Sequence, residues 1–335
     1  MKQENLLMKI ESVQQKIQLS GTILAKQGLD ELASISYGYA NRSEKIENEV
    51  NTKYAIASGC KIFTAIAICQ LIEKGDLSFK SKLKDCLVID FSYFDENITV
   101  HHLLTHTSGV PDYFDELWIK TPMYNIRKLQ DFLPLFQHEQ MKYPAGAKFQ
   151  YNNSGYILLG LIIENVSGMS FSEYVEKNIF QRVGMIDSGY FEMDALPVKT
   201  AIGYIELSDG TWKSNIYSLP VKGGSDGGAY VTATDMMKLW ESLTNYTLLS
   251  ESMTKKMLTP HAHEEDGLSY GYGIWIETND EEISKYLLMG YDPGVNFHAA
   301  FYPKQDFKII VCVNTSEGAY DMISGIEEVL TFSKS

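Results

Sequence analysis

Ser58 and Lys61 could together carry nucleophilic chemistry. They begin the segment SGCKIFTAIAICQLIEK, which is apolar on nearly every face and is followed by Gly75. We expect a buried helix over residues 58–74, and residues three apart on a helix project from the same face. At the first turn, unpaired backbone N–H groups would lower the cost of charge on an attacking serine oxygen. The amine could act as its base if burial lowers the pKa of Lys61.

A second polar group follows about ninety residues later. Tyr151-Asn152-Asn153 stands in KFQYNNSGYILLG. A tyrosinate beside an ammonium could abstract the serine proton, and an Asn side chain could hold a substrate amide. Two alternatives remain open at this point. An S-x-x-K pair also fits a serine cap followed by a surface lysine, and the Tyr and Asn residues also fit a turn before an ordinary helix.

Cysteine and histidine chemistry is less well supported. Cys60 could be a nucleophile, but no His stands nearby to assist it, and the four cysteines match no zinc or disulfide spacing. We expect reduced, mostly buried thiols. His261 and His263 form an H-A-H pair in a polar segment that we interpret as a loop, without the carboxylate or Cys pattern of a metal site. Structural hydrogen bonding is expected of the remaining central histidines (His101, His102 and His106). We therefore predict no metal and no cofactor.

Strands at both ends of the chain must position these residues. We expect a hairpin near the amino terminus, three consecutive strands near the carboxyl terminus, an amphipathic helix at each end and mostly helices in between. These patterns predict a mixed α and β fold, with an antiparallel sheet flanked by helices and a mostly helical lobe. The sheet lobe would take residues 1–80 and 196–335, the helical lobe residues 81–195, and the site would lie in the cleft between them.

Composition limits the partners. The chain has 335 residues, 44% of them hydrophobic and 21% charged, with a formal net charge of -14. Scattered cations and a negative balance argue against nucleic acid or an anionic membrane surface as a partner. No stretch is long and apolar enough to span a bilayer, and residues 1–21 do not read as a secretory signal. A cytoplasmic location is the expectation, with a processed secreted form as the alternative.

The order of these motifs resembles the penicillin-binding proteins, class C β-lactamases, D-alanyl-D-alanine carboxypeptidases and related esterases, over most of the chain. Ser58 and Lys61 match the first motif of that family, and Tyr151 and Asn153 match its Y-x-N motif. The segments HHLLTHTSGVPDY and GGAYVTATDMMKLW are similar to its loop before the helical lobe and to the segment that closes one side of its cleft. The resemblance implies a β-lactamase/transpeptidase-like fold.

The third motif of that family, Lys or His, any residue, then Gly, is altered here. Aligning on Asp292-Pro293-Gly294 places Leu288-Met289-Gly290 at the motif. The resemblance implies that Gly290 allows close approach of substrate and that the backbone N–H groups of Tyr291 and Ser58 form an oxyanion hole. Leu288 cannot supply the charge that helps relatives to bind a substrate carboxylate. Two further segments resemble the S-D-N and K-T-G motifs of class A relatives. They are Ser225-Asp226-Gly227 and Lys222-Gly223-Gly224, and we interpret them as a flexible loop at the cleft rim.

Together these observations predict a serine hydrolase that forms an acyl-enzyme on Ser58, with Lys61 and Tyr151 moving the proton. Its partner would be a small-molecule or peptide substrate, bearing an ester, an amide or a D-amino peptide bond. The alternative is a protein with the same scaffold but weak or no catalytic activity, which binds a ligand or has a regulatory role. The altered third motif would be consistent with this alternative.

Overall fold

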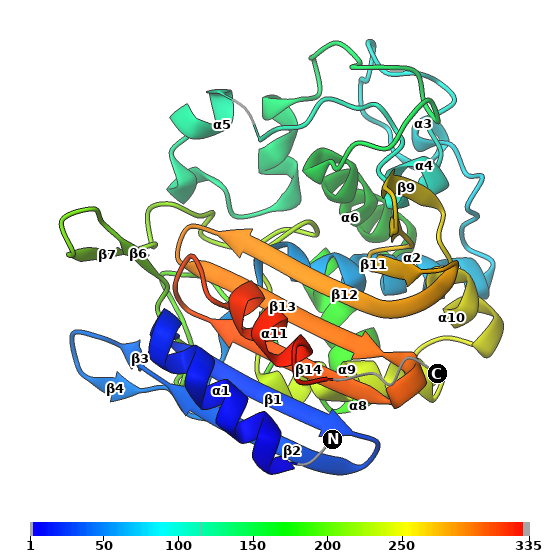
Figure 1. Ribbon diagram of the computed structural model, residues 1–335. Coiled ribbons are helices and arrows are strands. Elements are labelled where there is room, and N and C mark those ends of the chain that lie inside the picture. Colours follow the sequence, from blue (N-terminus) through cyan, green and yellow to red (C-terminus); the bar gives the residue numbers. More distant parts are fainter. Residues whose placement is uncertain (1–2, 115, 331–335) are drawn as a thin grey trace.

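An antiparallel sheet of eight strands forms the centre of the computed structural model, which describes residues 3–114 and 116–330 (Figure 1). The strand order is β2-β1-β14-β13-β12-β11-β10-β9. The sheet therefore joins the amino-terminal hairpin directly to the last strand of the chain. Its strands are β1 (Gly21–Gln27), β2 (Asp30–Tyr37), β9 (Ala262–Glu265), β10 (Leu268–Tyr270), β11 (Trp275–Asn279), β12 (Glu282–Asp292), β13 (Val295–Tyr302) and β14 (Phe307–Val313).

Helices cover both faces of this sheet, which explains why its central strands are buried throughout. Every residue of β13 and β14 is buried, as expected for strands packed on both sides. The two terminal helices, α1 (Gln3–Ile17) and α11 (Ala319–Glu327), pack on each other and on one face (Figure 1). On the other face, α9 (Ala233–Thr244) packs against β1 and β14. The amphipathic pattern of α1 places Leu6, Ile10 and Val13 in the core beneath it.

A second group of helices packs around α2 (Lys61–Lys74) and α6 (Asn153–Ser167). Every residue of α2 from Lys61 to Leu71 is buried, in agreement with its apolar sequence. Gly75 ends the helix in the left-handed conformation, at a φ of 84°, where glycine carries no steric penalty. The other helical segments are α3 (Leu83–Cys86), α4 (Val100–Leu104), α5 (Glu116–Lys120), η2 (Met123–Asn125), η3 (Leu129–Leu135), α7 (Phe171–Val175), η4 (Glu176–Phe180), α8 (Gln181–Val183), α10 (Glu251–Met257) and η5 (Pro303–Gln305).

Short strands attach the segment before Ser58 to the rest of the molecule. β5 (Tyr54–Ala55) pairs with β8 (Tyr230–Val231), and η1 (Ala57–Cys60) follows it directly. The backbone N–H of Lys53 also donates to the Lys199 carbonyl, and the backbone N–H of Ala201 donates to the Lys53 carbonyl. The remaining short strands are paired as β3 (Tyr39–Asn41) with β4 (Ile46–Glu47) and β6 (Tyr204–Glu206) with β7 (Trp212–Ser214).

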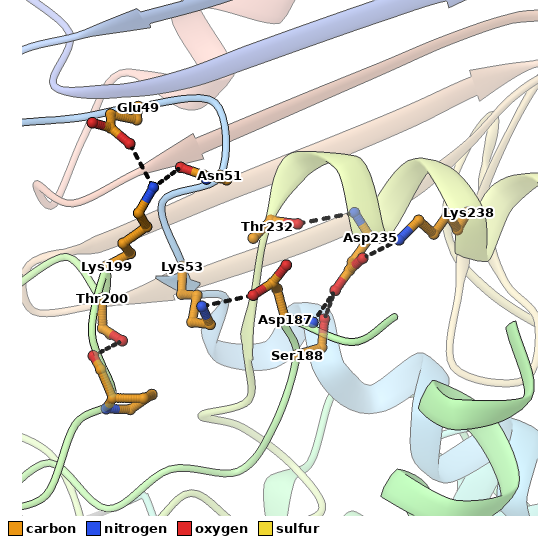
Figure 2. A network of polar contacts seen from close by, with 11 residues as sticks. Glu49, Asn51, Lys53, Asp187, Ser188, Lys199, Thr200, Thr232, Asp235 and Lys238 are labelled. Atoms are coloured by element: carbon orange, nitrogen blue, oxygen red, sulfur yellow. Dashed lines mark hydrogen bonds and ion pairs between the residues drawn. The ribbon is translucent and has the colours of Figure 1, made fainter. Parts of the chain in front are cut away.

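A polar network strengthens this attachment (Figure 2). Lys53 Nζ lies 2.8 Å from the Asp187 carboxylate, and the backbone N–H of Asp187 donates to Asp235 at 3.0 Å. Asp235 lies in the first turn of α9, is 1% exposed, and also accepts hydrogen bonds from Ser188 and Lys238 (Figure 2). The buried carboxylate thus has several donors, which offset the cost of removing it from water. The network connects α9 to the strand that leads into the Ser58 turn.

The mixed fold and the sheet built from both termini were predicted correctly, whereas the strands at the far edge were not. His263 lies in β9, and His261 stacks on Tyr272 with ring centroids 4.0 Å apart, so the predicted polar loop was wrong. The polar residues 263–266 hid this strand because β9 is an edge strand with most of its side chains exposed. The two-lobe division stays a prediction.

No described helix on its own has the length and hydropathy needed to cross a membrane. The pair Asn153–Ser167 and Phe171–Val183 passes that test only in combination, across a bend of 76°.

Candidate active site

Ser58 lies in a tight turn at the amino end of the buried helix α2. The preceding residue, Ala57, has a φ of 44°, a conformation that costs energy for any residue with a Cβ atom. The turn is held by a hydrogen bond from Gly59 N–H to the Ile56 carbonyl at 2.8 Å. Ser58 itself is partly exposed and lines a cavity. Strained backbone that a fixed surrounding maintains is typical of functional turns.

Lys61 makes three hydrogen bonds, each to a different acceptor. Its Nζ donates to Ser58 Oγ at 3.0 Å, to Asn153 Oδ1 at 2.9 Å and to the backbone carbonyl of Asp226 at 2.6 Å. Because an ammonium group has three donors and no acceptor, this arrangement fits the charged form of the side chain. The structure therefore brings together Ser58, Lys61 and Asn153, whose roles were predicted from two distant motifs.

The condition under which Lys61 could act as the base, a lowered pKa, is not met. Burial acts in the expected direction, but it is outweighed by the interactions of Lys61 with Tyr151 and Asp226. The pKa of Lys61 is consequently raised, and the side chain stays an ammonium. The second possibility, in which the ammonium assists a tyrosine oxygen that takes the proton, fits the structure better.

Tyr151 lies next to Lys61, with the Nζ atom 4.9 Å from the centroid of its ring. The ring packs between His106 at 4.3 Å and Trp275 at 5.9 Å between centroids. His106 Nδ1 also accepts the backbone N–H of Asn152 at 3.1 Å. Burial lowers the pKa of His106 well below its usual value, so this histidine is a neutral support rather than a proton carrier.

Asn153 begins α6, and a carboxylate orients its amide group. Asp112 accepts the backbone N–H of Asn153 at 3.3 Å and its side-chain Nδ2 at 3.4 Å. The amide oxygen is thereby turned toward Lys61. Burial raises the pKa of Asp112. The adjacent Asn152 caps the helix by accepting the Gly155 N–H, which fixes the start of α6 and with it both neighbours of the cap.

Strand β12 forms another wall of the site. Its pairing with β11 ends at Trp275 and Leu287, so no described strand lies beside Leu288–Asp292 on that edge. A Cβ atom on Gly290 would lie 1.9 Å from the Ile56 carbonyl oxygen, and only glycine allows the strand to approach the Ser58 turn this closely. Tyr291 lines the cavity, whereas Leu288 is 2% exposed and packs in the core.

Sequence reasoning missed three carboxylates at this site, Asp112, Asp226 and Asp292. Asp226 is 4% exposed, and its carboxylate accepts a short hydrogen bond from Tyr113. The segment 225–227 is a loop that borders the cavity, as predicted. It is more firmly held than a flexible rim, because Ser225 is fully buried and donates to the Tyr156 carbonyl at 2.8 Å. Asp292 was interpreted only as a turn residue. Its position two residues after Gly290 was a usable signal, since such residues share one face of a strand.

The cavity has a volume of about 280 Å³, in the size range of a small-molecule site. It is bordered by segments from both predicted lobes. Its polar lining comes from Ser58, Tyr151, Asn153, Asp226 and Asp292, and its apolar wall includes Phe114, Trp118, Phe132, Phe191, Met193, Leu219 and Trp275. Cys60 is fully buried, and burial raises the pKa of its thiol to about 11. Such a thiol is a poor nucleophile at neutral pH.

Comparison with known families identifies the family of this chain. The family model described as Beta-lactamase matches residues 12–330. The chain belongs to the Beta-lactamase family. Penicillin-binding protein 4* of Bacillus subtilis is 30% identical over 302 residues, which is 85% of this chain and 66% of that protein. This chain therefore spans just under two thirds of the length of that relative.

Solved structures of this family share the fold. A penicillin-binding protein from Bacillus halodurans is 60% identical and superposes with a TM-score of 0.92, over 95% of this chain and 98% of the other. An octameric penicillin-binding protein homologue from Pyrococcus abyssi is 26% identical, with a TM-score of 0.86 over 98% of this chain and 78% of that one. The chain thus has the fold of these penicillin-binding proteins.

Proposed function

We propose that this protein is a serine hydrolase that acylates Ser58 with an ester or amide substrate. The observation that carries the proposal is the 3.0 Å contact between Ser58 Oγ and the Lys61 ammonium at the wall of the cavity. A structural lysine would not need to be buried beside a partly exposed serine, because burying a charge costs energy unless it is paired.

The proposed reaction has two stages. Ser58 Oγ attacks the substrate carbonyl carbon, and its proton passes to the oxygen of Tyr151, which takes part in this step as a phenolate stabilised by the Lys61 ammonium. The backbone N–H groups of Ser58 and Tyr291 hold the oxyanion. Tyr151 then gives the proton to the departing alcohol or amine as its bond to the carbonyl carbon breaks. Water adds to the acyl-enzyme in the same way, and it releases the acid and restores Ser58.

Asn153 has a positioning role in this proposal. Its Oδ1 atom is held by Lys61, and its Nδ2 atom is held by Asp112. The amide can therefore keep the ammonium in place and can present a polar edge to the acyl group of the substrate.

Hydrolysis of a short activated ester, 4-nitrophenyl butyrate, tests the proposal. We expect turnover by the wild-type protein and its loss in Ser58→Ala, with unchanged circular dichroism. Ser43→Ala, which changes an exposed serine, is the matched control and should retain turnover. Equal turnover in wild type and Ser58→Ala would contradict the assignment of the nucleophile. No turnover in either would instead favour a protein that binds its ligand without reacting.

A further inference from the structure

Asp292 is a cavity residue that the proposed reaction does not use. It ends the exposed edge of β12, immediately after Tyr291, and lines the same cavity as Ser58. No hydrogen bond or ion pair reaches its carboxylate from any described residue, whereas the Asp226 carboxylate has Tyr113 as a donor. Asp292 shares a strand face with Gly290, which abuts the Ser58 turn. Its carboxylate therefore lies on the side of the strand where the reaction would take place.

The charges around this carboxylate are mostly of the same sign. Asp292 and Asp226 interact repulsively, and burial together with that repulsion raises the pKa of Asp292 to about 7. Lys61 is the cation that faces both of them, and its three donors are already occupied. None of the described residues that line the cavity is Lys, Arg or His. Among the described residues, Lys61 is therefore the cation near Asp292, and it is already hydrogen-bonded to Ser58, Asn153 and Asp226.

The electrostatic consequence differs between substrates. A substrate carboxylate would enter beside two carboxylates without a cation to receive it, and like charges that face one another across an interface are unfavourable. Leu288 is buried in the core and adds no positive charge. A substrate ammonium would instead pair with Asp292 and relieve its repulsion with Asp226. Charge-assisted hydrogen bonds of this kind are stronger than hydrogen bonds between neutral groups.

We propose that the cavity selects acyl groups that carry a free α-amino group and an apolar side chain, and that Asp292 is the residue that binds the ammonium. This inference rests on the proposed function, because it concerns the substrate of Ser58. Tyr291, whose N–H would hold the oxyanion, directly precedes Asp292, which places the carboxylate near the acyl carbon. The aromatic wall formed by Phe114, Trp118, Phe132 and Phe191 suits a phenylalanine-sized side chain.

Three ethyl esters with one carbon skeleton test this inference. They are racemic phenylalanine ethyl ester, ethyl 3-phenylpropanoate and monoethyl benzylmalonate, in which the α-carbon carries an ammonium, a hydrogen and a carboxylate respectively. The racemate avoids any assumption about configuration. The measured quantity is kcat/KM for acid release, and its ratio between the amino ester and the neutral ester is compared in wild type and Asp292→Asn. Comparing the ratio between the two proteins cancels the intrinsic reactivity of the esters.

We expect that ratio to fall about tenfold or more in Asp292→Asn, which corresponds to the loss of a charge-assisted contact. Asp292→Lys should shift the preference toward the malonate. The control Asp266→Asn removes the same charge from an exposed position and should leave the ratio within about twofold. Folding of each variant is checked by circular dichroism and by its thermal transition.

The outcomes separate the two proposals. Turnover of the neutral ester by wild type, combined with an unchanged ratio in both Asp292 variants, would overturn the ammonium site and leave the hydrolase standing. A preference of the wild-type protein for the malonate would also overturn it. No turnover of any of the three esters by a protein that hydrolyses 4-nitrophenyl butyrate would overturn this inference alone, whereas no turnover of that activated ester would overturn the proposed function and this inference with it.

Discussion

The proton chemistry of this site is distributed over a tyrosine and a lysine with different duties. The hydrogen bonds of Lys61 to Ser58, Asn153 and Asp226 occupy every donor that an ammonium has. A base needs a free lone pair, which this geometry does not leave on the amine. The ammonium can instead stabilise negative charge on the Tyr151 oxygen and on the attacking Ser58 oxygen.

The substitution Tyr151→Phe tests the contribution of the hydroxyl group separately from that of the ring. The phenylalanine ring retains the packing against His106 and Trp275, while the group that accepts and returns the proton is lost. We expect kcat/KM for 4-nitrophenyl butyrate to fall by about 10²–10⁴-fold, the usual contribution of a positioned acid or base. Tyr217→Phe, at an exposed tyrosine, should have no comparable effect. A loss smaller than about threefold in Tyr151→Phe would show that another group moves the proton.

The residues predicted from sequence are those joined by a local pattern. Ser58 and Lys61 share one helical face, and Tyr151 and Asn153 flank a helix cap, so short spacing carried the information. Asp112, Asp226 and Asp292 lie in three segments far apart in the chain, and their proximity depends on the packing of the whole fold. Each of them also has an ordinary local explanation as a turn or loop residue, which hid its place at the site.

At the scale of elements, the site depends on how closely β12 approaches the turn before α2. The two elements meet through main-chain atoms, because a Cβ atom at position 290 would lie 1.9 Å from the Ile56 oxygen and 2.9 Å from Gly59 N. A backbone atom cannot rotate away as a flexible side chain can. The spacing of the strand and the turn, and hence of the two predicted oxyanion donors, is therefore set by Gly290.

Gly290→Ala should separate these two elements. We expect a loss of at least about 1–3 kcal/mol in the free energy of unfolding, typical of overpacking, together with a marked loss of kcat. Urea unfolding and ester hydrolysis measure the two effects. Gly155→Ala is the matched control, because its Cβ atom would come no closer than 3.4 Å to a neighbour and alanine is favoured over glycine within a helix. Equal stability of both variants would contradict the close approach.

The elements themselves were predicted with uneven success, for a physical reason. Buried elements are recognisable from their composition, as the apolar runs of β13, β14 and α2 show. The edge strand β9 carries three exposed residues among its four, so its sequence resembles a loop. Its strand conformation depends on pairing with β10, which is a tertiary contact that no local pattern records.

At the scale of the whole molecule, the sheet ties the two ends of the chain together. All seven residues of β1 pair with β14, and α1 packs on α11 above them. The site lies where this sheet meets the helices around α2, and the two-sided burial that stabilises the fold also removes the site carboxylates from water. Stability and function are thereby coupled through the same buried charges.

Asp292 should make the stability of the protein depend on pH. Its pKa is raised from 3.8 to about 7, so the folded state binds more protons than the unfolded state between these values. Its contribution to stability is present below about pH 4 and is lost as the pH rises through about 7. The charged groups that face it are Asp226 and Lys61, and the neutral Tyr113 hydroxyl is also near it. Asn at this position cannot ionise, so Asp292→Asn should become more stable than wild type as the pH rises.

Urea unfolding of both proteins from pH 4 to pH 8 measures this difference. We expect the advantage of Asp292→Asn to grow over that range to about 4 kcal/mol and to level off above about pH 7, because the pKa shift is about three units and one unit corresponds to about 1.4 kcal/mol. Asp30→Asn, at an exposed residue, controls for the change in net charge. A difference between Asp292→Asn and wild type that stays constant with pH would mean that the Asp292 carboxylate titrates alike in the folded and unfolded chains. The buried repulsion between Asp292 and Asp226, on which the ammonium site depends, would then be absent.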